Sequence, residues 1–208
     1  MLGSVLQNSL LASRTLIIRQ GKRLVYNSGF PDDIQKDGSV NTDQTVYQAY
    51  LASEIGTLAI AGTEDYITSV EFVEPNQGYS NGIRAEIPQA VRDCINQFEE
   101  YFNGDRREFS VRLAPEGTEF QKRVWRQLST IPYGTTTTYL DIAKAVGNEK
   151  AVRAVGAANG QNPISIIVPC HRVIGRDGKL TGYGGGLWRK EWLLKHEGGL
   201  HGQQLTLF

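Results

Sequence analysis

Residues 162–173 read NPISIIVPCHRV and place a thiol, an imidazole and a guanidinium in succession at Cys170, His171 and Arg172. The thiolate is the reactive form of cysteine, and a free thiol with a pKa of about 8.5 needs a basic or cationic neighbour near neutral pH. His171 can accept that proton if a carboxylate orients its other ring nitrogen. The acid expected nearby in an ordered helix is Glu191. The alternative is a buried structural cysteine beside an incidental histidine.

The segment before this motif predicts two short helices joined by a tight turn. Thr138 and Asp141 have the spacing of an N-terminal capping pair, and Gly147 closes the first helix. Asn148 is placed to cap the second helix, over residues 149–159, which is rich in small side chains. This pattern is typical of a helix-turn-helix, although many helical domains contain one.

The first half of the chain has a different pattern. Short β-type runs over 48–52, 57–61 and 69–73 precede a helix with one apolar face over 91–102. Cys94 lies on that apolar face and is expected to be a buried core thiol. Residues 1–45 are expected to form a polar extension or linker, with a hairpin of 15–18 and 23–26 as the alternative.

Composition narrows the class of protein. Of 208 residues, 40% are hydrophobic, and no apolar run approaches the length of about 18 residues that spans a membrane. The N-terminus lacks the pattern of an export signal, so a cytoplasmic location is expected. Two cysteines and three histidines argue against a disulfide scaffold or a zinc site, and we expect no metal and no cofactor.

Charge is split along the chain. Residues 1–117 carry a net charge of −6 and residues 118–198 a net charge of +6, although the whole chain is neutral. A basic half beside an acidic half indicates that the C-terminal part meets a polyanion.

Two longer runs give a family resemblance. IIVPCHRVIG at 166–175 and LTGYGGGLWRKEWLLKHEG at 180–198 resemble the O6-alkylguanine-DNA alkyltransferases, closely over 120–198 and loosely over 47–113. The resemblance implies an α+β protein, with a small N-terminal ribonuclease H-like α/β domain and a mainly helical C-terminal domain containing a helix-turn-helix. The expected boundaries are an extension at 1–45, the two domains at 46–113 and 114–198, and a tail at 199–208.

The resemblance also implies a chemistry for the motif. Cys170 would attack the alkyl carbon on O6 of a damaged guanine in double-stranded DNA and keep the group, in a single turnover without a cofactor. His171 would act as the base through a water, Glu191 would orient His171, and Asn162 would hold the turn. Tyr139 would donate a hydrogen bond to guanine N3. O4-alkylthymine is a second expected substrate, and the chain is expected to act as a monomer.

The same resemblance assigns residues to the DNA and to the flipped base. Arg153 would enter the base stack in place of the flipped nucleotide, and small side chains would let its helix approach the minor groove. A backbone N–H of the glycine-rich loop would meet O6. The residues assigned in this way are Arg153, Ala154, Gly156, Val173, Tyr183 and Gly184. Two other classes are a lesion sensor, which would lack the acceptor cysteine, and a cysteine hydrolase, which would have no need of Arg153.

The C-terminal tail suggests a protein partner. Residues 204–208 read QLTLF and resemble the short peptides that bind the bacterial sliding clamp. Two leucines and a terminal phenylalanine on a polar tether can anchor an extended peptide in an apolar groove. The residues assigned to this contact are Gln204, Leu205, Leu207 and Phe208. The alternative is a tail that folds back onto its own domain.

We predict that deletion of residues 203–208 abolishes capture of the chain by immobilised sliding clamp, because the deletion removes both leucines and the phenylalanine. Transfer of the alkyl group to Cys170 should continue, since the deleted residues lie beyond the acceptor domain. A pull-down and a transfer assay on the same two proteins check this. Loss of alkyl transfer would instead indicate that the tail folds back onto the domain.

Overall fold

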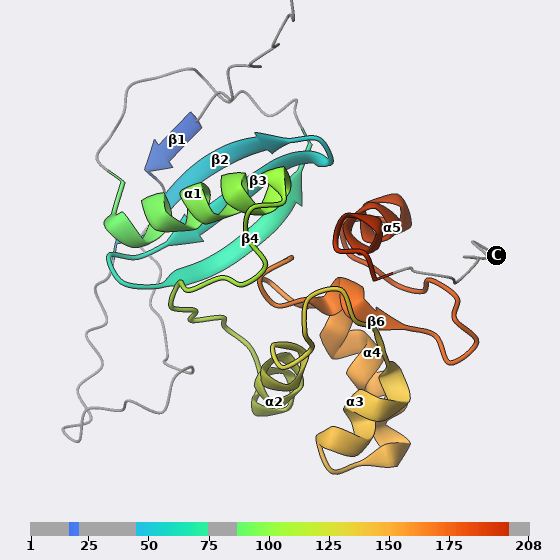
Figure 1. The fold of residues 1–208 in the computed structure, drawn as a ribbon. Coiled ribbons are helices and arrows are strands. Elements are labelled where there is room, and N and C mark those ends of the chain that lie inside the picture. The colour runs from blue at the N-terminus through green and yellow to red at the C-terminus, as the bar shows by residue number, and fades with distance from the viewer. Residues whose placement is uncertain (1–16, 21–44, 75–86, 200–208) are drawn as a thin grey trace, which may run out of the picture.

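The chain is described here by a computed structural model that covers residues 17–20, 45–74 and 87–199 (Figure 1). An antiparallel sheet of order β1-β2-β3-β4 forms one part of the molecule. Its strands are β1 (Ile17–Gln20), β2 (Tyr47–Ser53), β3 (Gly56–Gly62) and β4 (Ile67–Val73). The three strands predicted from 48–73 are confirmed, and no described helix is long and apolar enough to cross a membrane.

The N-terminal segment adds a strand to this sheet. β1 pairs antiparallel with β2, with Ile17 opposite Tyr50. In the alternative interpretation this segment would pair with 23–26, which lies outside the described residues. The described part of the extension therefore contributes an edge strand, whereas the sequence predicted a linker.

Helix α1 (Gln89–Asn103) covers one face of the sheet. Its apolar side chains recur with helical spacing, so Val91, Cys94 and Phe98 are all fully buried. Gly104 ends the helix in the left-handed conformation at φ 83°. Burial raises the pKa of Cys94, as expected for a core thiol.

The second half is mainly helical (Figure 1). Short strands β5 (Thr137–Thr138) and β6 (Val173–Ile174) pair in parallel between the helices. The predicted capping pair is confirmed, because Thr138 and Asp141 cap each other across the first turn of α3. The helices are α2 (Glu119–Leu128), α3 (Tyr139–Ala145), α4 (Val152–Gly160) and α5 (Leu187–His196), with 3-10 turns η1 (Glu149–Ala151) and η2 (Cys170–Arg172).

The two parts share a hydrophobic core and a line of backbone hydrogen bonds. The N–H of Val70 on β4 donates to Pro163 O at 2.8 Å, and the N–H of Ser165 donates to Val70 O at 2.9 Å. One buried cluster includes Phe98 of α1 as well as Val173 of β6. The edge of the sheet is thus fixed directly against the segment that leads into Cys170.

We predict that Trp125→Phe lowers the free energy of unfolding by about 2 kcal/mol, because it removes a hydrogen bond and leaves a small cavity. The indole N–H of Trp125 on α2 donates to Ala158 O of α4 at 2.8 Å, and the side chain is buried. Urea unfolding measures the change. The matched control is Trp188→Phe, since Trp188 is 52% exposed. Equal losses in both variants would contradict the prediction.

Candidate active site

The turn before Cys170 is closed by the side chain of Asn162. Its Nδ2 donates to Val168 O at 2.8 Å, and its Oδ1 accepts from the N–H of Ile164 at 3.0 Å. Ile166 inside the turn has φ 72°, a conformation that is unusual for a β-branched residue. Because Asn162 bonds both ends of the turn, it holds this strained backbone in place.

The same amide reaches the thiol. Asn162 Nδ2 lies 3.1 Å from Cys170 Sγ, and Cys170 is only 4% exposed. Burial raises the pKa of Cys170, while the Asn162 hydrogen bond and the charge of Lys190 oppose that rise. The site therefore keeps the thiol protonated at rest and holds groups that stabilise the thiolate.

Lys190 on α5 is buried beside the thiol. Its ammonium group donates to Val173 O at 2.6 Å and to Thr181 O at 2.7 Å. Burial lowers the pKa of Lys190 to about 8. A positive charge in this position favours the thiolate, so Lys190 belongs to the chemistry of the site although the sequence analysis did not single it out.

The imidazole of His171 is oriented by Glu197. His171 Nε2 lies 2.9 Å from Glu197 Oε1, so Nε2 carries the proton and Nδ1 is left as the basic nitrogen. Nδ1 is buried and has no hydrogen-bond partner among the described residues. Burial lowers the pKa of His171 and keeps the ring neutral near pH 7.

Glu197 is itself held by Arg172. The guanidinium donates from Nε to Oε2 at 2.7 Å and from Nη2 to Oε1 at 2.9 Å, which is a two-point pairing. Burial raises the pKa of Glu197, but the hydrogen bond from His171 and the hydrogen bonds and charge of Arg172 outweigh it and hold the pKa well below its usual range. Glu197 is therefore ionised at neutral pH.

The structure corrects the role predicted for Glu191, because the carboxylate that orients His171 is Glu197. Glu191 Oε1 accepts from Lys195 Nζ at 2.6 Å, on the outward side of α5. Successive residues of a helix are rotated by about 100°, so a residue six positions further along points to a different side. Glu197 directly follows α5 and turns inward to His171. The Lys195 spacing is the sequence signal that could have marked Glu191 as a surface residue.

Tyr139 and Tyr183 pack against the hydrophobic cluster that contains Cys170. The hydroxyl of Tyr139 donates to Thr181 O at 3.0 Å. Burial raises the pKa of Tyr139 and of Tyr183, so both phenols are protonated at neutral pH. Val173 contributes its carbonyl to the same region through Lys190.

The glycine-rich loop is tied to the sheet by Arg189. Its Nη1 donates to Gly185 O and its Nε donates to Ile55 O, both at 2.6 Å. The guanidinium also stacks over the rings of Phe72 and Trp188, at 4.6 Å and 4.5 Å. The position of this loop is thus set by residues of the first half of the chain.

The remaining expected residues are exposed or half-buried, or lie outside the described residues. Arg153 and Ala154 are exposed on α4, Gly156 is half-buried on the same helix, and Gly184 is exposed in the loop. The tail residues 204–208 lie outside the part of the chain that the structure describes. Within the described ranges, no three His, Cys, Asp or Glu side chains are close enough to hold a metal ion.

A buried thiol bonded by an amide, beside an imidazole that a carboxylate orients, defines a class of proteins that use cysteine as a nucleophile. The chain belongs to the 6-O-methylguanine DNA methyltransferase family. Models of that family match residues 46–115, described as its ribonuclease-like domain, and residues 119–199, described as its DNA binding domain. The family resemblance and the expected fold, a ribonuclease-like domain followed by a helical domain, are confirmed.

Individual relatives agree with the family match. The chain is 51% identical over 160 residues to the methylated-DNA--protein-cysteine methyltransferase of Methanosarcina acetivorans, covering 74% of this chain and 99% of that one. It resembles the crystal structure of Mycobacterium tuberculosis O6-methylguanine methyltransferase with a TM-score of 0.63 and 48% identity. That match covers 72% of this chain and 90% of that one. It also resembles the crystal structure of Mycobacterium tuberculosis OGT in complex with DNA, with a TM-score of 0.64 and 47% identity. That match covers 72% of this chain and 91% of that one.

We predict that Glu197→Gln flattens the dependence of stability on pH. The pKa of Glu197 is lower in the folded chain than the usual value of about 4.3, so its contribution is present above that pH and is lost as the pH falls. At pH 7 the variant should lose about 3 kcal/mol, because Arg172 stays buried without its partner. The difference from wild type should shrink towards pH 3.

Urea unfolding at pH 7, 5, 4 and 3 measures this effect. Glu191→Gln is the matched control, because Glu191 pairs with Lys195 at the surface of the same segment. It should follow the wild-type curve. A flattened curve for Glu191→Gln, with an unchanged one for Glu197→Gln, would overturn the assignment of the buried carboxylate.

Proposed function

We propose that this chain repairs alkylated DNA by moving the alkyl group from O6 of guanine to Cys170. Its relatives carry the name methylated-DNA--protein-cysteine methyltransferase, and a similar structure was determined in complex with DNA. The observation that carries the proposal is the thiol of Cys170, bonded by Asn162 and followed by an imidazole that Glu197 orients.

The transfer is a displacement at the alkyl carbon. His171 Nδ1 takes the thiol proton through a water, and the sulfur forms a bond to the alkyl carbon. The bond from that carbon to O6 breaks, and its electron pair stays on the guanine. The guanine anion then takes a proton, so the net change exchanges the thiol proton for the alkyl group. Lys190 stabilises the thiolate before attack.

The product explains a single turnover. A thioether on Cys170 is a stable, uncharged group, and the proposed site supplies no second nucleophile to remove it. Each chain therefore acts once, and the protein is consumed in proportion to the lesions repaired. A cysteine hydrolase would regenerate its thiol and would release product repeatedly.

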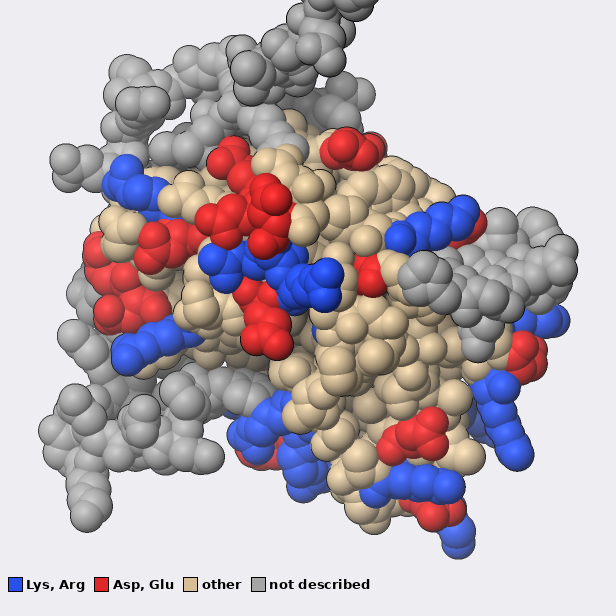
Figure 2. All heavy atoms as spheres, in the orientation of Figure 1, with Lys and Arg blue, Asp and Glu red and all other residues tan. Residues whose placement is uncertain are grey.

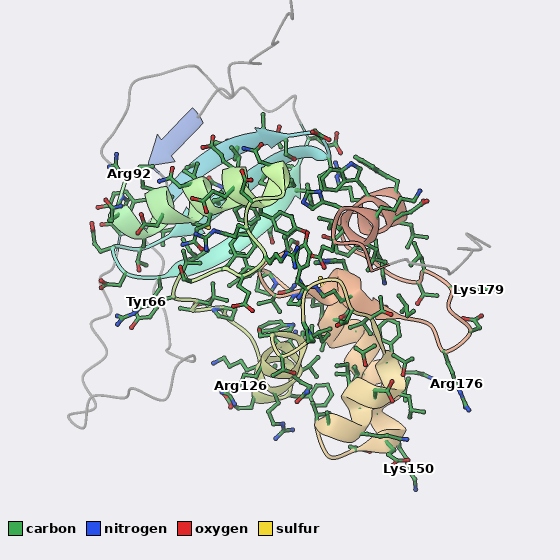
Figure 3. All side chains as sticks on the ribbon, in the orientation of Figure 1. Tyr66, Arg92, Arg126, Lys150, Arg176 and Lys179 are labelled. Atoms are coloured by element: carbon green, nitrogen blue, oxygen red, sulfur yellow. The ribbon has the colours of Figure 1, made fainter. Side chains whose placement is uncertain are left out.

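The helical domain is the proposed DNA-binding face. Helices α3 and α4 pack against each other, which supports a helix-turn-helix, and Arg153 is exposed on α4. Figure 2 shows basic side chains along the outer edge of the helical part. Figure 3 shows Arg126, Lys150, Arg176 and Lys179 extending from α2, the turn before α4 and the loop before α5. Such groups bind phosphates without reading sequence.

The lesion must leave the base stack to reach Cys170, because the thiol is buried beneath the surface. We propose that Arg153 fills the gap and that Ala154 and Gly156 let α4 approach the minor groove. Tyr139 then donates to guanine N3, the backbone at Gly184 meets O6, and the Val173 carbonyl accepts from the exocyclic amine. O4-alkylthymine is a second candidate substrate. We further propose that the chain acts as a monomer on chromosomal DNA in the cytoplasm. Its tail would bind the sliding clamp.

The deciding experiment is intact-mass spectrometry after mixing the chain with duplex DNA that contains one O6-methylguanine. We expect one methyl group per protein, mapped by peptide analysis to Cys170, and no further gain with excess DNA. Cys170→Ser should gain none, and Cys94→Ser should behave as wild type because Cys94 is a core thiol. An unmodified protein that still binds the lesion would indicate a sensor, and repeated release of a methylated product would indicate a hydrolase.

A further inference from the structure

The buried carboxylate of Glu197 also contacts the ribonuclease-like domain. The hydroxyl of Tyr101, in the last turn of α1, donates to Glu197 Oε1 at 2.8 Å. We propose that Tyr101 is a positioning residue for alkyl transfer, which fixes Glu197 and thereby the ring of His171. This inference rests on the proposed function and deepens it, because it makes the ribonuclease-like domain a component of the acceptor site.

The geometry at Glu197 shows why Tyr101 matters. Oε1 accepts from Tyr101 at 2.8 Å, from His171 Nε2 at 2.9 Å and from Arg172 Nη2 at 2.9 Å. Three donors meet at this oxygen, one from α1 and two from η2. Without the hydroxyl, the donors to Oε1 come only from the adjacent residues His171 and Arg172. The long contact from the N–H of Gly134 to Oε2, at 3.4 Å, is then the remaining restraint on the carboxylate from another segment.

Tyr101 is suited to act as a permanent donor. The side chain is fully buried, and burial together with the charge of Glu197 raises its pKa well above the ordinary value. The phenol therefore stays protonated at neutral pH. An ionised carboxylate can only accept, so the direction of this hydrogen bond is fixed.

The backbone of Tyr101 is anchored to the same part of α5. His196 Nε2 donates to Tyr101 O at 2.7 Å, and His196 directly precedes Glu197. The ring of Tyr101 is enclosed by aromatic neighbours, with ring centroids 5.0 Å from His196, 5.5 Å from Phe109 and 6.3 Å from Tyr133. Both ends of Tyr101 thus connect α1 to the end of α5, which leaves its hydroxyl little freedom to move.

The consequence concerns the nitrogen that takes the proton. His171 Nδ1 is useful only while the ring faces the thiol, and the ring orientation follows from the bond between Nε2 and Glu197. A carboxylate that rotates carries the ring with it and lengthens the path from Cys170 Sγ to Nδ1. Loss of the Tyr101 hydroxyl should therefore slow the chemical step and leave DNA binding unchanged.

The test compares Tyr101→Phe with Tyr133→Phe. Both remove one phenolic hydroxyl from the same aromatic cluster, but the hydroxyl of Tyr133 donates to the backbone carbonyl of His196 at 3.3 Å, not to Glu197. Single-turnover transfer of methyl from lesion DNA is followed at saturating DNA, and the active fraction is counted by titration. We expect the rate of methyl transfer per active molecule to be about tenfold lower in Tyr101→Phe than in wild type, because the variant loses a hydrogen bond to a charged group. Tyr133→Phe should match wild type.

Two further measurements separate positioning from general stability. The dissociation constant for lesion DNA should be the same for Tyr101→Phe and wild type. In a Glu197→Gln background, adding Tyr101→Phe should cause little further loss, because the two residues act through one contact. An equal additional loss in that background, a change in DNA affinity alone, or an unchanged rate for Tyr101→Phe would each overturn the inference.

The wild-type chain distinguishes this inference from the proposed function. If wild type transfers no methyl group to Cys170, the proposed function fails, and the role of Tyr101 fails with it. If wild type transfers methyl and Tyr101→Phe does so at the same rate, only the role of Tyr101 is overturned.

Discussion

The ionised carboxylate of Glu197 constrains the rest of the site. A buried charge is stable only when each of its lone pairs meets a donor, and here the donors come from separate parts of the chain. Arg172 and His171 approach from η2, Tyr101 from α1, and the N–H of Gly134 lies 3.4 Å from Oε2. Because these segments must converge on one group, the position of His171 beside Cys170 depends on how the whole molecule is packed.

The contact between the two domains is therefore part of the active site. The edge of β4 binds the segment before Cys170 through Val70, and Arg189 ties the glycine-rich loop to Ile55. Each link uses a backbone carbonyl or N–H, so it restrains the main chain directly. The ribonuclease-like domain holds the turn, the loop and the carboxylate at three separate points. A helical domain on its own would lack all three restraints.

Much of this could be predicted from the sequence. Strands β2 to β4, the apolar face of α1 and the capping pair of α3 follow local periodicity and capping rules, which the chain obeys. Cys170, His171 and Asn162 are close in sequence, so their proximity was also visible. The sequence pointed to Glu191 because it lies within an expected helix, whereas the role of Glu197 depends on where the chain turns after α5. The contact of Tyr101 could not be predicted, because its position on the apolar face of α1 does not indicate which distant residue its hydroxyl will bind.

The deep burial of Cys170 has a consequence for the proposed single-turnover transfer, in which each chain would act once. A thiolate on the surface would be oxidised, or would be alkylated by the same small electrophiles that damage DNA, and each such event would waste a molecule. Cys170 is 4% exposed, and burial raises its pKa, so it rests as a shielded thiol. In the proposed reaction, the thiol meets its substrate only when a flipped base enters the site. Burial thus protects the acceptor thiol from side reactions before the proposed transfer.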